Sequence, residues 1–297
     1  MNQGVFNYIE TDDLAELTIL NARTAYVYAH GRSRIDLYDS KNITAEAQAN
    51  ASAQLMIHGG RFDRVYTWPL GGTIELDGYL VTGSLTANDG GILRQNGGRS
   101  QSLSSADGGL AILDQGTVQE YMGSSGRSTL VIAGGIPPEE DIRLFSQARV
   151  LVFHSGAAIQ GKTITEKHSK LILADLDEKG ISSDYSSIST VLTLDGHDRK
   201  AFFSAWNHDW PNKWTGSLEL IQLNDELYVE ILPGTRMALL AFRVPRTVVI
   251  QPQVSKDGGS WEPLGDPIFG DGAIHTAESR LHGDEKQTFR LHISNNS

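Results

Sequence analysis

Short apolar segments recur along the first two thirds of the chain at a nearly constant spacing. Within each segment Leu, Ile or Val alternates with other residues, which is the period-2 pattern of a β-strand that buries one face. Most segments end in Gly, Asn or Asp, which tolerate the positive φ of a sharp corner. The segments start at Leu17, Ile35, Leu55, Ile74, Leu93, Ala111, Leu130, Leu151 and Leu171, so successive starts lie 18 to 21 residues apart.

A repeat of this length is typical of a solenoid, in which each repeat forms one coil that stacks on the next. The pattern therefore predicts a parallel, right-handed β-helix of about nine coils of 18–21 residues over residues 14–180. A further segment at Leu192 would add one coil. The alternative is a β-sandwich with regularly spaced hairpins. Sandwich strands recur every 8–12 residues or so, so the longer and steadier step favours the solenoid.

The character of the chain changes from about residue 181. Gly-Gly pairs become rare, and four of the five tryptophans lie in this part. Alternating segments at 216–223, 226–232, 237–244, 247–255 and 288–294 have the pattern of conventional strands, with Asn-Asp and Asp-Gly turns between some of them. We expect an antiparallel, β-sandwich-like module over residues 181–297, serving as a cap of the solenoid or as a recognition module. The whole protein is then all-β.

Composition narrows the classes of partner. The net charge of −11 argues against nucleic acid and anionic lipid, both of which need a basic surface. The absence of cysteine excludes disulfides and thiolate metal sites. No run of apolar residues is long enough for a transmembrane helix. The first residues lack the features of a signal peptide, and we expect a mature fragment of an extracellular or cell-surface protein, with a virion or the cytoplasm as alternatives.

No constellation of catalytic residues is evident. Polysaccharide-cleaving enzymes need clustered carboxylates, and the acids at segment ends are Asp39, Asp77, Asp114 and Asp175. Aspartate is a favoured corner residue, and other residue types in the intervening coils interrupt the row. Residues 175–180 resemble the start of a calcium loop, but Lys179 and Ser186 stand where ligands are needed. The sequence predicts no catalytic residue, no metal site and no cofactor.

One aromatic segment is the candidate ligand-binding site. Tryptophan recurs there every four residues, with polar side chains between. Tryptophan faces stack on sugar rings while the polar groups hydrogen-bond to hydroxyls, so we expect a glycan ligand. In the alternative interpretation, the tryptophans pack beneath the module or against the solenoid end. The candidate residues are Trp206, Asn207, His208, Asp209, Trp210 and Trp214.

Two parts of the chain resemble known families. The Gly-rich repeats at 85–135 resemble the passenger repeats of bacterial autotransporter adhesins. The segment 254–294 resembles the small β-modules that close many large secreted bacterial proteins, through Ser255, Asp257, Gly258, Trp261, Leu264, Phe289 and Arg290. The resemblance implies a right-handed β-helix displayed on a cell surface, where it mediates adhesion or self-association.

These observations favour a non-enzymatic adhesin or structural protein that contacts a glycan or another cell-surface partner. A phage tail fibre or spike is the first alternative, since such fibres also combine β-helices with β-rich tips. A β-helix polysaccharide lyase or hydrolase is the second alternative, and it rests on fold analogy alone.

Overall fold

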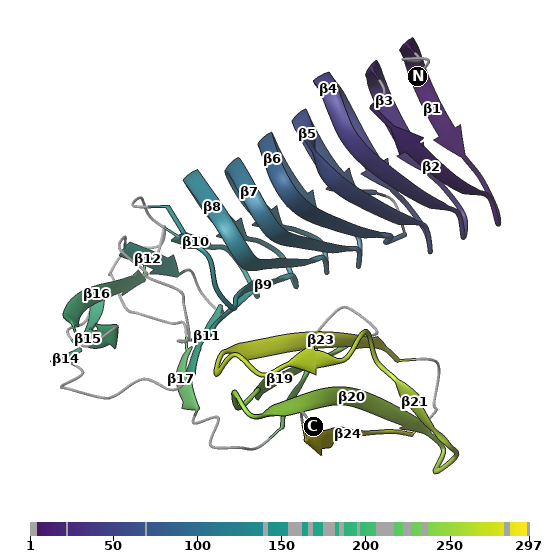
Figure 1. Cartoon of the computed structure of the whole chain (residues 1–297). Coiled ribbons are helices and arrows are strands. Elements are labelled where there is room, and N and C mark those ends of the chain that lie inside the picture. The colour runs from purple at the N-terminus through teal and green to yellow at the C-terminus, as the bar shows by residue number, and fades with distance from the viewer. Residues whose placement is uncertain are drawn as a thin grey trace.

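The computed structural model describes residues 5–21, 23–68, 70–138, 142–153, 162–165, 169–174, 182–183, 187–194, 197–205, 217–221, 227–232, 237–281 and 286–295. All regular secondary structure among these residues consists of β-strands (Figure 1). The all-β prediction is therefore confirmed for the described part of the chain.

The first part of the chain is a parallel β-solenoid, as the repeat predicts. Its strands are β1 (Val5–Thr11), β2 (Glu16–Leu20), β3 (Arg23–Ala29), β4 (Arg34–Ala49), β5 (Gln54–Thr67), β6 (Thr73–Ala87), β7 (Ile92–Ser105), β8 (Leu110–Ser124), β9 (Thr129–Ile132), β10 (Ile142–Leu144), β11 (Arg149–Phe153), β12 (Lys162–Thr165) and β13 (Lys170–Ala174). It has about seven turns, slightly fewer than the nine predicted.

Each long strand bends and contributes to two sides of the solenoid. The first face is the side of the solenoid built from residues 16–20, 34–38, 54–58, 73–77 and the segments that stack on them. The second face is the side built from residues 5–11, 23–29, 46–49, 64–67, 84–87 and the segments that stack on them. On the first face Leu37 lies opposite Ile57, and Ile57 opposite Leu76, and all three are fully buried. Burying such a side chain stabilises the fold by about 1.5–3 kcal/mol, so the stacked inward columns hold the coils together.

The corner between coils repeats a left-handed backbone conformation. At successive coils the position is held by Asp13, Gly31, Ala51, Leu70, Asp89, Asp107, Gly126 and Ser146, with φ between 49° and 68°. Residues other than Gly, Asn and Asp rarely adopt this conformation. The turn is tight: at Gly109, a Cβ atom would lie 2.2 Å from the Ala87 carbonyl oxygen. The corner that the sequence predicts lies at the other end of each first-face segment, where Asn21, Asp39, Gly59 and Gly78 also have positive φ (53°, 48°, 99° and 74°).

The regular stacking is interrupted after β13. Strands β14 (Ser182–Ser183), β15 (Ser187–Leu194) and β16 (His197–Ala205) pair antiparallel. The tenth candidate coil at Leu192 was therefore wrong, because this residue lies in the antiparallel strand β15. Parallel stacking resumes where β16 pairs with β12 and β17 (Ser217–Ile221) pairs with β13. The segment at 216–223, expected as the first antiparallel strand of the module, instead pairs with the solenoid.

The last part of the chain is an antiparallel module of two small sheets. One sheet contains β18 (Tyr228–Leu232), β19 (Met237–Arg243) and β23 (Ile274–Arg280). The other contains β20 (Val248–Lys256), β21 (Trp261–Pro263), β22 (Ile268–Phe269) and β24 (Gln287–Asn295). Leu240, Phe242 and Ile250 are buried between the sheets. The predicted sandwich-like arrangement is thus confirmed.

The module packs on the outer side of the first face, beside the later coils (Figure 1). Strand β19 alternates: Leu239 and Ala241 contact the solenoid, whereas Leu240 and Phe242 point into the module. On the solenoid side this interface buries Ile92, Leu110, Ile112, Val131, Leu151, Phe153 and Ile172. Strands buried on both faces are apolar along their whole length, which explains the continuous apolar runs at 110–113 and 130–133.

Candidate functional site

The second face carries an outward-facing group of aromatic and charged side chains on its first coils. The register aligns these residues in columns: Tyr8, Tyr26, Glu46 and Arg64 lie opposite one another in one column. A neighbouring column contains Glu10, Tyr28, Gln48 and Tyr66. We call the whole group the aromatic grid, and it comprises Tyr8, Glu10, Tyr26, Tyr28, His30, Glu46, Gln48, Asn50, Arg64, Tyr66 and Trp68.

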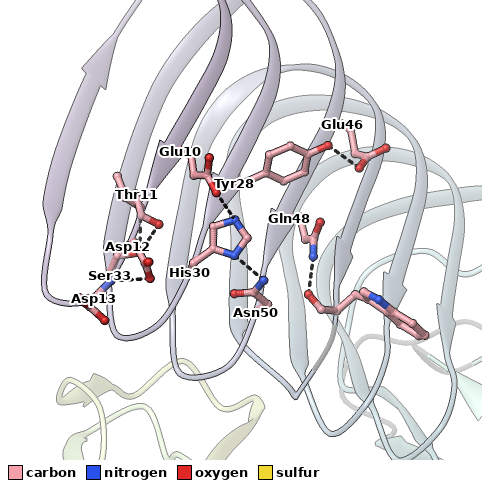
Figure 2. Close-up of polar contacts among 11 residues, drawn as sticks. Glu10, Thr11, Asp12, Asp13, Tyr28, His30, Ser33, Glu46, Gln48 and Asn50 are labelled. Atoms are coloured by element: carbon pink, nitrogen blue, oxygen red, sulfur yellow. Dashed lines mark hydrogen bonds and ion pairs between the residues drawn. The ribbon is translucent and has the colours of Figure 1, made fainter.

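Glu46 is at the centre of the first polar network (Figure 2). Its carboxylate accepts a hydrogen bond of 2.7 Å from the Tyr28 hydroxyl. It accepts another from the Tyr66 hydroxyl. The Arg64 guanidinium lies 3.0 Å away on the other carboxylate oxygen. Burial and the bond to Glu46 raise the pKa of Tyr28 above its usual value and the pKa of Tyr66 to about 12. Both phenols therefore keep their protons at physiological pH, and the network holds their rings in place.

His30 is at the centre of a second network (Figure 2). The Asn50 amide nitrogen contacts His30 Nδ1, and Glu10 Oε1 lies 3.1 Å from His30 Nε2. Because an amide nitrogen can only donate, Nδ1 accepts and the ring proton lies on Nε2, facing the carboxylate. Gln48 donates to the Trp68 carbonyl oxygen. The polar side chains of the grid are thus fixed by one another across neighbouring coils.

Several aromatic rings of the grid remain open to solvent. Tyr8, Tyr26 and Trp68 expose 51%, 40% and 47% of their surface. The rings of Tyr8 and Tyr28 lie 5.1 Å apart, and those of Tyr26 and Tyr28 stack at 6.2 Å. Clustered exposed aromatics are unusual on a soluble surface and mark contact sites.

The aromatic character ends at the fourth coil. In the next coils the same columns hold Ser84 and Thr86, then Ser102 and Ser104. Thr86 and Ser104 hydrogen-bond to each other at 3.1 Å. The grid is therefore a bounded surface at the N-terminal end of the second face.

The sequence predicted a different set of residues as the ligand-binding site. Trp206, Asn207, His208, Asp209, Trp210 and Trp214 all lie outside the described residues, as does Asp175.

The other corner acids have separate environments. Asp39 lies in a left-handed corner (φ 48°), and the Asp77 carboxylate accepts a hydrogen bond from the Gly78 amide at 2.6 Å. Asp114 pairs with Arg94. Within the described part of the chain, no three His, Asp or Glu residues are grouped so that they could hold a metal ion.

The grid could have been found from the sequence with one further step. The segments at 26–30, 46–50 and 64–68 alternate aromatic or polar residues with Val, Ala or Thr. If the repeat period of the first-face segments is applied to these three segments, it predicts that they lie side by side on neighbouring coils. The stronger signals in the sequence are the apolar first-face segments and the tryptophan-rich segment, and neither contains these residues.

Comparisons with known proteins place no further constraint on the site. No family model, no curated protein and no solved structure matches the chain. No helix among the described residues is long and apolar enough to cross a membrane.

Proposed function

We propose that this protein is a non-enzymatic adhesin of the extracellular or cell-surface type, which binds a glycan through the aromatic grid. The observation that supports the proposal is the set of half-exposed rings of Tyr8, Tyr26 and Trp68 on the second face. The solenoid serves as a rigid support, since each coil is hydrogen-bonded to its neighbours along the face.

The chemistry of the grid suits sugars. The C–H faces of a pyranose ring pack on aromatic rings, and carboxylate and amide groups beside the rings bind hydroxyls. The grid supplies Glu10, Gln48 and Asn50 for this purpose. Its two carboxylates outnumber its single guanidinium, and the whole chain carries a net charge of −11. The proposed ligand is accordingly a neutral or cationic glycan, since a polyanionic one would be repelled.

Fixed side chains favour binding. The Glu46 network holds Tyr28 and Tyr66 before any ligand arrives, so little rotamer entropy remains to be lost on binding. The tryptophan segment at 206–214 stays a prediction as a second contact surface. Surface display also remains part of this proposal, and it rests on the resemblance of the repeats to adhesin passengers.

A glycan array tests the proposal. The wild-type chain is expected to bind a subset of neutral or amino-containing glycans, and the Tyr26→Ala, Trp68→Ala double variant is expected to lose at least about 90% of that signal, because stacked aromatics dominate such contacts. Tyr38→Ala is the matched control. Tyr38 is 37% exposed and stacks on His58 on the first face, whereas Tyr26 is 40% exposed and stacks on Tyr28.

Two results would count against the proposal. One is the absence of binding to any glycan by the folded wild-type chain. The other is an equal loss of binding in the Tyr38→Ala variant and the grid variant.

A further inference from the structure

A cavity lies where the module meets the first face of the solenoid. Its volume is about 360 Å³, and residues from both parts line it. Glu75 and Arg94 come from the solenoid, whereas Leu264, Pro267 and Ile268 come from the module. We call it the junction cavity. Ligand sites in proteins occur preferentially between domains and begin at about this size.

Both terminal nitrogens of Arg94 in this cavity are already engaged. Its guanidinium pairs with Asp114 of the solenoid and with Glu278 of the module. Both terminal nitrogens also lie 3.2 Å from the Thr276 hydroxyl. The arginine side chain is only 12% exposed. Its donors are therefore directed to these partners and not to the remaining carboxylates of the cavity.

Glu75 is the side chain without a partner. No described residue donates a hydrogen bond to its carboxylate or forms an ion pair with it. Burial raises its pKa, and the nearby charge of Arg94 opposes that effect only in part. Glu75 is half-buried, so a donor or a cation that satisfies its carboxylate is favourable. The cavity is open beside this group, so a ligand can supply what the protein does not.

We propose that the junction cavity binds a small organic amine, whose ammonium group pairs with Glu75. The charges select a cation, because Asp266 and Glu278 also line the cavity, while among the described lining residues Arg94 is the one arginine or lysine. His275, also in the lining, is engaged by Asp271 at 3.0 Å. Leu264, Pro267 and Ile268 form an apolar wall that suits the hydrocarbon part of the ligand.

This site is separate from the proposed glycan surface. The aromatic grid lies on the second face, and the junction cavity lies on the first face beneath the module. Variants of the aromatic grid therefore test glycan binding, and variants of the junction cavity test amine binding, so the two proposals can fail separately.

Calorimetric titration of the full chain with butylamine tests the proposal, with butanol and butyrate as probes of similar size. Butylamine is expected to bind at least about tenfold more tightly than either of the others, since only it can form the charge-assisted bond. Glu75→Gln keeps the shape of the side chain and removes its charge, and it should weaken butylamine binding at least about tenfold. Asp77→Asn is the matched control on the same strand, and it should leave the affinity unchanged, because Asp77 does not line the cavity.

Circular dichroism is used to check that both variants are folded. The proposal is overturned if butylamine and butanol bind equally, or if no amine binding occurs up to about 10 mM, where even a millimolar site would be occupied. It is also overturned if Glu75→Gln binds butylamine like the wild type. A loss of binding in Asp266→Asn combined with normal binding in Glu75→Gln would move the site to Asp266 and refute the assignment.

Discussion

Arg94 of strand β7 and Glu278 of strand β23 form an ion pair that joins the solenoid to the module, 184 residues apart in the chain. The same guanidinium also pairs with Asp114 one coil further along. All three side chains are mostly buried, with 12%, 17% and 22% of their surface exposed. The module is therefore held on the first face by directed contacts as well as by the apolar interface around Leu239.

Replacing Arg94 should loosen this junction. Arg94→Met keeps much of the side-chain volume but leaves the Asp114 and Glu278 carboxylates without their cation. Removing one member of a buried charge network costs about 3–5 kcal/mol, so the urea midpoint should fall and proteolysis within the module should become faster. Lys256→Ala is the control: its pair with Glu262 is exposed (43% and 59%), and its loss should cost less than about 1 kcal/mol. An equal effect of both variants would show that the Arg94 network does not hold the module.

Leu70 is a position where a substitution should stabilise the protein. It lies in the left-handed corner at φ 63° and is 79% exposed. A leucine is strained there and gains little from packing, whereas Asn tolerates this conformation. Leu70→Asn should raise the free energy of unfolding by about 0.5–1 kcal/mol, measured by urea denaturation. Leu20→Asn is the control, because Leu20 is also exposed (65%) but lies in strand β2. It should give no gain, and an equal gain in both variants would refute the backbone explanation.

The tyrosines of the grid predict how stability changes at high pH. Burial and the bond to Glu46 raise the pKa of Tyr66 to about 12 and raise the pKa of Tyr28 as well. In the unfolded chain such phenols ionise near pH 10 or so. The folded state therefore holds these protons more tightly, and this stabilisation is present in full below about pH 10 and is lost between about pH 10 and 12.

Urea unfolding measured from pH 8 to 12 checks this expectation. The Tyr28→Phe, Tyr66→Phe double variant should show a shallower fall than the wild type. Tyr38→Phe is the control and should keep the wild-type slope, because Tyr38 stacks on His58 and no carboxylate of the described residues accepts a hydrogen bond from it. Identical profiles for all three proteins would contradict the role of the Glu46 network.

The solenoid follows from local features of the sequence. Each coil contacts mainly its neighbours, so inward residues such as Leu37, Ile57 and Leu76 must recur at one period, and the corners need Gly or Asp at the same period. Both requirements act between neighbouring coils, so they appear in the sequence as a repeat of apolar and corner residues. The module strands, set by short-range alternation and Asp-Gly turns, were also largely predictable.

How the solenoid and the module pack together became clear from the tertiary structure alone. The outer side of the first face at 110–113 and 130–133 is covered by Leu239, which lies more than a hundred positions later in the chain, and no repeat relates the two. The pairing of Arg94 with Glu278 and the junction cavity depend on that docking. The aromatic grid is intermediate, since Tyr26, Glu46 and Arg64 are close only because the register stacks successive coils. Contacts between neighbouring coils can be predicted from the repeat period in the sequence. Contacts between the solenoid and the module depend on how the two folded surfaces fit together.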